Sequence, residues 1–240
     1  MPLATPLRSI ALLVLSLAAT GFAQAQATIT HDKALAGGVT PGDTAGYPVT
    51  ITQPGSYKLM SNLYVPAGSK GISVQTAGVS LDLNGFTIQG PGSCTRNAGT
   101  KQVSCTGTGG LGVYSEADTS FMQVRNGTIQ GFNHGVVMNG GRAEGLILRH
   151  NNSGLVNSAG GYSGAIIAGV VAQLNLIGVQ AEHAQVQDSI LIANNTGVRC
   201  DNGAVLNSQV LQNRFGLESC SMSKIHFASN GTDSTGSTGY

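Results

Sequence analysis

The sequence returns at nearly constant intervals to one pair of residue types, a glycine followed by an aliphatic residue. The second residue is Ile, Val or Leu in all seven cases, and the last five glycines are 19, 24, 19 and 19 residues apart. The seven glycines are Gly71, Gly112, Gly135, Gly154, Gly178, Gly197 and Gly216. A period near 20 residues is typical of a repeat architecture in which each unit stacks on the one before it.

A turn-forming pair falls between successive glycines. The pairs are NG, NG, EG, AG, DS and NS, beginning at residues 84, 126, 144, 168, 188 and 207, and short β-rich stretches flank them. Asn, Asp and Gly adopt sharply bent backbone conformations at little cost. Three short strands per unit cannot bury their own apolar side, but parallel stacking at about 4.8 Å per coil does so. The sequence therefore predicts an all-β fold, a right-handed single-stranded parallel β-helix of about seven coils, whose hand follows from the general crossover rule.

An asparagine stands three residues before four of these glycines. Equal offsets become vertical neighbours in a stack, so these side chains should form a ladder in which each amide hydrogen bonds to the next. The ladder residues are Asn151, Asn175, Asn194 and Asn213. The aliphatic residues after the glycines should form a second, inward-pointing column that includes Val136, Val179 and Val198.

The bounds of the regular repeat define the other segments of the chain. Residues 28–70 are predicted to be an N-terminal segment with capping strands, and residues 71–228 the β-helix itself. An insertion at residues 90–110 should be closed into a small loop by a disulfide, and residues 229–240 should form a flexible polar tail.

The four cysteines are expected to form two disulfide bonds. Proximity along the chain favours Cys94 with Cys105 and Cys200 with Cys220, and the sequence alone leaves the other two connectivities open.

The N-terminus has the pattern of an export signal. Arg8 precedes the apolar stretch IALLVLSLAAT and the small-residue stretch AQAQA, so residues 1–25 are predicted to be a signal peptide, cleaved after Ala25 or Ala27. The eleven apolar residues are too few to span a bilayer, so we expect a secreted protein, extracellular or periplasmic, without a transmembrane anchor. Without Arg8 the chain has 11 basic and 11 acidic residues, a balance that gives no basis for binding nucleic acid.

Two stretches carry a resemblance to a known group of proteins. PGSYKLMSNLYVPAGSKGISVQTAGVSLDLNGFTIQG at 54–90 and MQVRNGTIQGFNHGV at 122–136 are similar to the first coils of secreted bacterial members of the pectin-lyase-like, right-handed parallel β-helix superfamily. The resemblance implies the fold but no single activity, since this superfamily holds lyases, hydrolases, epimerases, tailspikes and adhesins.

The catalytic motifs of this superfamily are missing. The chain has no Asn-Thr-Asp, adjacent acidic pair, Gly-His-Gly or Arg-Ile-Lys of the polygalacturonase type, and the pectate-lyase motif needs a tryptophan that the chain lacks. The histidines also lack zinc-site spacing. We therefore expect a non-catalytic surface, adhesion or glycan-binding module whose partner is a polysaccharide or cell-surface glycan. A polysaccharide lyase, epimerase or hydrolase with an atypical site is the alternative.

Strand alternation selects a candidate surface. If the residue after each glycine points inward, the residues two and four after the glycine point outward on the same sheet. The outward residues proposed for ligand binding are Tyr114, Glu116, Asn139 and Gln180.

Four charged residues gather on the last coils of this surface. These are Glu182, Arg199, Asp201 and Glu218, which are also the candidate catalytic residues. Glu182 and Asp201 should stack one coil apart, where like charges repel unless a cation lies between them. No cofactor is otherwise expected; Ca²⁺ held by Glu182 and Asp201 is the one candidate metal.

Overall fold

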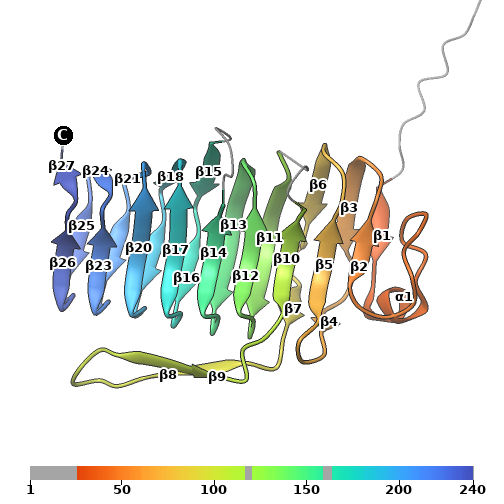
Figure 1. Ribbon diagram of the computed structural model, residues 1–240, viewed down its shortest axis with the longest axis horizontal. Coiled ribbons are helices and arrows are strands. Elements are labelled where there is room, and N and C mark those ends of the chain that lie inside the picture. Colours follow the sequence, from red (N-terminus) through yellow and green to blue (C-terminus); the bar gives the residue numbers. More distant parts are fainter. Residues whose placement is uncertain (1–25, 117–120, 159–163, 240) are drawn as a thin grey trace, which may run out of the picture.

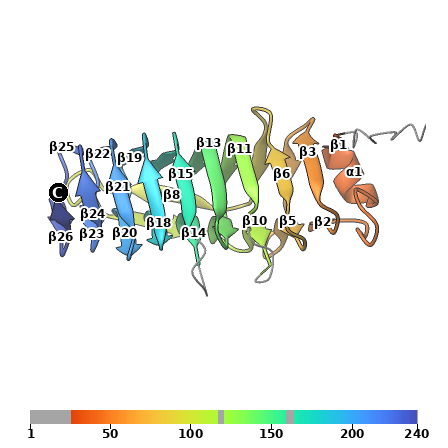
Figure 2. The ribbon, with the colours of Figure 1, turned by 90° about the horizontal axis from the view of Figure 1, so that it is seen from above.

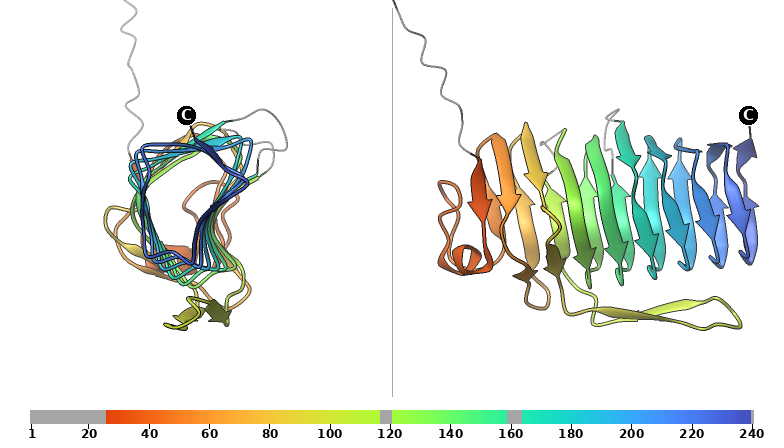
Figure 3. Two further views of the ribbon diagram at one scale, coloured as in Figure 1. Left: turned by 90° about the vertical axis from the view of Figure 1, so that its left-hand side faces the viewer. Right: turned by 180° about the vertical axis from the view of Figure 1, so that it is seen from behind.

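The chain winds into a parallel β-helix (Figure 1). The computed structural model describes residues 26–116, 121–158 and 164–239, so the signal peptide predicted at residues 1–25 lies outside the described residues. Seen end-on, successive coils superimpose almost completely (Figure 3). Among the described residues no helix is long and apolar enough to cross a membrane.

Three strands per coil form the walls of the solenoid. The first wall is a nine-stranded sheet made of β2 (Val49–Ile51), β5 (Lys70–Val74), β10 (Leu111–Ser115), β12 (His134–Met138), β14 (Ser153–Asn157), β17 (Ile177–Glu182), β20 (Thr196–Asp201), β23 (Phe215–Glu218) and β26 (Thr232–Thr235).

The other two walls belong to one sixteen-stranded sheet, because β11 and β13 run through the bend between them. The second wall contains β1 (Ala27–Ile29), β3 (Gly55–Leu59), β6 (Val79–Asp82), β11 (Gln123–Gln130), β13 (Gly141–Arg149), β15 (Ala165–Ala168), β18 (Ala184–Gln187), β21 (Ala204–Leu206), β24 (Ser221–Ser223) and β27 (Thr238–Gly239). The third wall continues from β11 and β13 and contains β4 (Leu63–Tyr64), β7 (Thr87–Gln89), β16 (Val171–Gln173), β19 (Ile190–Ile192), β22 (Gln209–Leu211) and β25 (His226–Ala228).

The predicted inner column of aliphatic residues is confirmed. Val136 pairs with Leu155, Leu155 with Val179, and Val179 with Val198, and all four side chains are fully buried. The column continues beyond the seven predicted coils, because Val49 lies in register with Ile72 at one end and Ser234 with Leu217 at the other. Parallel stacking therefore gives a single continuous core along the whole axis.

Each corner between the second and third walls contains a residue with positive φ, and the first corner contains two, Asn84 and Gly85. The predicted turn pairs supply this residue in all six cases, at Asn84, Asn126, Gly145, Gly169, Asp188 and Asn207, with φ between 43° and 60°. The next coil makes the same bend at Lys224, with φ of 53°. A left-handed residue at a fixed place turns the strand direction without breaking the stack.

The predicted asparagine ladder is present and fully buried. The Nδ2 of Asn175 donates to Oδ1 of Asn194 at 3.0 Å, and that of Asn194 donates to Oδ1 of Asn213 at 3.1 Å. In Asn175, Asn194 and Asn213 the Oδ1 also accepts the main-chain N–H of the asparagine one coil earlier, as between Asn175 and Asn194 at 3.0 Å. Asn151 begins the ladder and Asn230 adds a fifth amide, which bonds Asn213 at 3.2 Å. The ladder thus satisfies polar groups that would otherwise be orphaned inside the core.

Both disulfide bonds follow the predicted pairing. Cys94 and Cys105 lie opposite each other in an antiparallel hairpin, with their Cα atoms 4.0 Å apart. Cys200 and Cys220 join the ends of neighbouring strands, with their Cα atoms 5.0 Å apart, and both are buried.

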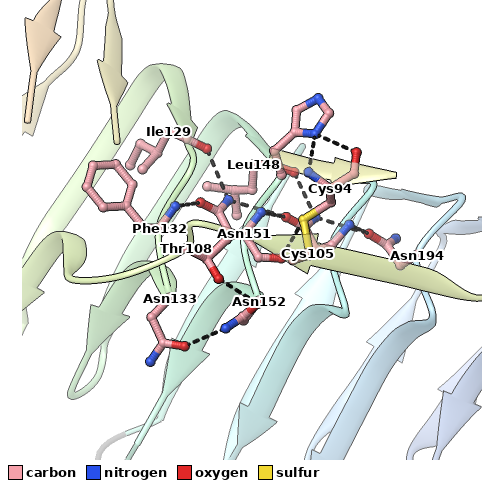
Figure 4. The surroundings of a disulfide bond; sticks show 12 residues. Cys94, Cys105, Thr108, Ile129, Phe132, Asn133, Leu148, Asn151, Asn152 and Asn194 are labelled. Atoms are coloured by element: carbon pink, nitrogen blue, oxygen red, sulfur yellow. Dashed lines mark hydrogen bonds between the residues drawn. A yellow bond between two sulfur atoms is a disulfide. The ribbon is translucent and has the colours of Figure 1, made fainter. Parts of the chain in front are cut away.

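The insertion at residues 90–110 is a strap along the solenoid rather than a small separate loop (Figures 1 and 2). Its strands β8 (Ser93–Arg96) and β9 (Val103–Thr106) lie beside the ladder residue Asn151 (Figure 4). The sulfur atoms of Cys94 and Cys105 lie 3.7 and 3.6 Å from the Asn151 carbonyl oxygen (Figure 4). Farther along, Arg96 Nη2 donates to the Gln212 carbonyl at 2.6 Å. The strap therefore contacts coils that are far from it in sequence.

The two ends differ from the prediction. The N-terminal segment contains a helix that the sequence analysis did not predict, α1 (His31–Ala36), whose N-cap Thr30 accepts from the Lys33 N–H at 3.1 Å. This helix lies beyond the first coil, whereas the expected capping strands β2 and β3 belong to the sheets (Figure 1).

The flexible tail expected at residues 229–240 is wrong for its described part. Residues 232–239 contain β26 and β27, which pair in register with β23 and β24. The last ladder amide, Asn230, fixes the turn before β26 by donating to Asp233 at 2.9 Å. Small polar residues form a regular coil here because the preceding coil supplies the backbone partners.

Candidate functional site

The outward face of the nine-stranded sheet carries the predicted site residues in the predicted order. One row contains residues that share a register position from coil to coil, namely Ser73, Tyr114, Val137, Val156, Gln180, Arg199 and Glu218. Glu182 and Asp201 are also in register on neighbouring strands, as expected. The structure thus brings the predicted residues onto one surface.

At the N-terminal end of this face the polar groups are bound to one another. Lys70 Nζ lies 4.0 Å from the centre of the Tyr114 ring and 3.5 Å from Glu116 Oε1. The Ser73 hydroxyl donates to the same carboxylate at 3.1 Å, and Asn139 Nδ2 donates to the Glu116 carbonyl at 3.2 Å. Because Lys70 covers one face of the Tyr114 ring, that face cannot stack against a ligand.

At the C-terminal end the charges are partly compensated. Arg199 Nε donates to Glu218 Oε2 at 2.7 Å, so the guanidinium already has a carboxylate partner. Gln180, in the same outward row, accepts from the Ser153 hydroxyl at 3.2 Å. In the described part of the chain no three His, Cys, Asp or Glu side chains come together in a way that could hold a metal ion. Glu182 and Asp201 alone fall short of the six to eight oxygen ligands that Ca²⁺ takes.

His134 lies at the start of β12, between Leu111 and Ser153 of the neighbouring strands. Its Nδ1 is buried without a hydrogen-bond partner among the described residues. Burial lowers the pKa of His134 below the ordinary histidine value. The side chain is therefore neutral near pH 7 and acts as a structural residue of this face.

The lowered pKa of His134 predicts a loss of stability in mild acid. The unfolded chain takes up the proton first, near pH 6.5, so the free energy of unfolding should fall as the pH drops below about 6.5, until the folded state also binds the proton. Urea denaturation between pH 5 and 7.5 measures this slope. His134→Gln should flatten the slope of unfolding free energy against pH. The control His226→Gln, at an exposed position, should leave the slope as it is in the wild type. Equal slopes in the wild type and His134→Gln would refute the assignment of the slope to His134.

An open groove lies at the N-terminal end of the solenoid, where α1 approaches β4. It encloses about 520 Å³ and is lined by Tyr64, Phe86 and Met60 together with His31, Asp32 and Asn62. We call it the N-terminal groove. Tyr64 is 55% exposed and Met60 49%, which leaves their apolar surface open to a ligand.

Hydrogen bonds fix the polar wall of the N-terminal groove. The His31 N–H donates to the Ser61 hydroxyl at 2.8 Å, and His31 Nδ1 lies 3.0 Å from the Tyr47 hydroxyl oxygen. The rings of His31 and Tyr64 meet edge to face, with centroids 5.5 Å apart. Asn62 Oδ1 accepts the Thr87 N–H at 2.9 Å, which ties the groove to the next coil. The groove is therefore held in shape before any ligand binds.

Sequence reasoning missed the N-terminal groove. Its residues come from α1, from the turn after β3, from β4 and from the residue before β7, and the unpredicted helix brings these segments together. The available signal was the grouping of aromatic residues, because Tyr47, Tyr57, Tyr64 and Phe86 fall within 40 residues of a chain with only 5% aromatic residues.

A second groove lies on the same corner column near the other end. It encloses about 460 Å³ between Asp188, Asn207 and Lys224 at the bends and Ile190, Gln209 and His226 on the third wall. Asn207 Nδ2 donates to Asp188 Oδ1 at 2.6 Å. No aromatic ring except the His226 imidazole lines this groove.

The geometry places the chain among the parallel β-helix proteins, and comparison with solved structures agrees. The enzymatically active domain of tailspike protein 2 from bacteriophage CBA120 superposes with a TM-score of 0.57 at 12% identity, over 90% of this chain and 38% of that chain. The Dettilon tailspike protein aligns with a TM-score of 0.42 at 11% identity, over 89% and 53% of the two chains. No protein-family model and no curated protein matches the chain. At these identities the likeness to the first tailspike shows the fold alone.

Proposed function

We propose that this protein is an exported, non-catalytic glycan-binding module whose ligand occupies the N-terminal groove. The observation that carries the proposal is the combination, in one preformed groove, of exposed aromatic surface with fixed polar groups. The CH-rich faces of sugar rings pack against aromatic side chains, while the hydroxyl groups need hydrogen-bond partners. Sites for small ligands combine apolar walls and a few placed polar groups in the same way.

The two aromatic side chains and the polar groups have separable roles. Tyr64 and Phe86 provide the apolar surface, while Asn62 and Asp32 offer oxygen acceptors for sugar hydroxyls. Asn62 Nδ2 adds a hydrogen-bond donor, and the bond between Oδ1 and the Thr87 N–H fixes the orientation of this amide.

A binding role without catalysis agrees with the other observations. The candidate catalytic residue Arg199 is paired with Glu218, and the catalytic motifs of the superfamily that the chain resembles are missing from the sequence. Two disulfide bonds favour an oxidising compartment, which supports export and a ligand met outside the cytoplasm.

Removing the aromatic surface of the groove should abolish most of the binding. We expect Tyr64→Ala to weaken the affinity for the best-bound oligosaccharide roughly ten-fold or more, which corresponds to about 1.4 kcal/mol. Isothermal titration calorimetry with hexasaccharides first selected on a glycan array measures the change. Tyr114→Ala is the matched control, since Lys70 covers one face of its ring, and it should leave the affinity unchanged.

The opposite effects of the two substitutions on affinity would place the ligand elsewhere on the protein. If Tyr114→Ala weakens binding and Tyr64→Ala does not, the ligand lies on the nine-stranded sheet and the groove assignment is wrong. Shortening of a polysaccharide by the wild-type protein, lost on substitution of a groove or sheet residue, would replace the binding role with an enzymatic one.

A further inference from the structure

The charge of the N-terminal groove restricts the kind of glycan that it can hold. The side chains that line it include one carboxylate, Asp32, and no lysine or arginine. Asp32 is exposed at the rim, and neighbouring Lys33 directs its ammonium to the Thr28 carbonyl at 3.2 Å. A carboxylated sugar in the groove would therefore meet a like charge without a cation in the lining to compensate it.

The contact between His31 and Tyr47 bears on which ring nitrogen of His31 can donate to a ligand. Burial raises the pKa of Tyr47 to about 12, although a hydrogen bond from the Tyr64 main chain acts in the opposite direction. Tyr47 thus keeps its proton and can donate it to His31 Nδ1, which lies 3.0 Å from the hydroxyl oxygen. A neutral imidazole that accepts at Nδ1 carries its own proton on Nε2.

These groups together define a ligand class. A sugar hydroxyl or an acetamido carbonyl can accept from His31 Nε2–H, and hydroxyl groups can donate to the Asp32 carboxylate. Tyr64 and Phe86 offer apolar surface and no charge.

We infer that the N-terminal groove selects uncharged oligosaccharides over polyuronates, with His31 as a fixed donor and Asp32 as the group that excludes carboxylated sugars. This inference rests on the proposed function and names the ligand class for the same groove.

The test compares neutral with anionic probes on the full chain. Cellohexaose, maltohexaose and chitohexaose form the neutral set, and hexagalacturonate and hexamannuronate form the anionic set. Calorimetric titration at low salt should show the best neutral probe binding at least roughly ten-fold tighter than either uronate. Asp32→Asn should narrow this ratio from both sides, because it removes the charge that repels uronates and also weakens the charge-assisted hydrogen bonds that neutral sugar hydroxyls make with the carboxylate.

The tautomer of His31 can be observed directly. Imidazole ¹⁵N chemical shifts should show the Nε2–H form in the wild-type protein and a mixture of both neutral forms in Tyr47→Phe. A dominant Nδ1–H form in the wild type would refute the role of His31 as a donor.

Failure of the inference and failure of the proposed function give different results. Uronate binding as tight as neutral binding, abolished by Tyr64→Ala, would keep the groove as a glycan site and overturn its selectivity. If the folded protein binds none of the probes, the proposed function fails and the inference with it.

Discussion

Replacing Asn194 by alanine is expected to lower the free energy of unfolding by on the order of 4 kcal/mol. The amide stands in the middle of the ladder, where Nδ2 donates to the Ala172 carbonyl at 2.9 Å and to Asn213 Oδ1 at 3.1 Å. Its Oδ1 accepts both the main-chain N–H and the Nδ2 of Asn175. Alanine removes all four bonds, and the Asn175 N–H then lacks this acceptor inside a core that excludes water.

Chemical denaturation monitored by circular dichroism measures the effect of Asn194→Ala. Asn133→Ala is the matched control, because Asn133 is only half-buried and accepts a single side-chain bond, from Asn152 at 2.8 Å. The control should lose less than about 1 kcal/mol. Equal losses in the two variants would show that the ladder contributes no more than an ordinary surface amide.

The regular coils were predictable from the sequence because stacking converts equal spacing into contact. An offset of three residues between Asn194 and Gly197 recurs at Asn213 and Gly216, so each side chain meets its own counterpart one coil later. The turn pairs were equally informative, since Asn, Asp and Gly adopt the positive φ found at Asn84 at little cost. The same logic put Arg199 and Glu218 on one outward face, and in the structure the two side chains form an ion pair.

The irregular parts could not be predicted in this way, because they do not repeat. The strap at residues 90–110 and the helix α1 occur once, so no second copy reveals where they pack. Arg96 reaches the Gln212 carbonyl across 116 residues of sequence, a contact that no period in the chain encodes. The N-terminal groove depends on a contact between α1 and β4 that likewise occurs only once in the chain. The sequence therefore showed that aromatic residues are concentrated in this segment, but it did not show that they line a groove.

The structure also supplies a physical reason for the seven repeated glycines, which the sequence analysis used only to mark the period. None of the seven has a positive φ, so backbone freedom does not require them. They are required because the next coil passes too close to leave room for a side chain. At Gly197 an added Cβ would lie 2.5 Å from the Gly216 carbonyl oxygen and 3.3 Å from Asn213 Nδ2.

Gly197→Ala is therefore expected to destabilise the protein by about 3 kcal/mol, the upper end of the usual cost of overpacking. The nearest atom belongs to the backbone of the following coil, so relief requires the two coils to separate, and this would also stretch the ladder bond between Asn194 and Asn213. The free energy of unfolding from denaturant titration gives the magnitude. Hydrogen exchange should show the loss of protection concentrated in β20 and β23, which flank the added methyl group.

Gly99→Ala in the strap is the control for Gly197→Ala. Its φ is not positive, and its added Cβ would meet only Asn97 Oδ1 at an ordinary 3.5 Å, so the stability should be unchanged. If Gly197→Ala proved as stable as this control, close approach of successive coils could not be the reason for the glycine column. The interval of 19 residues would then have to reflect the turn sequences alone.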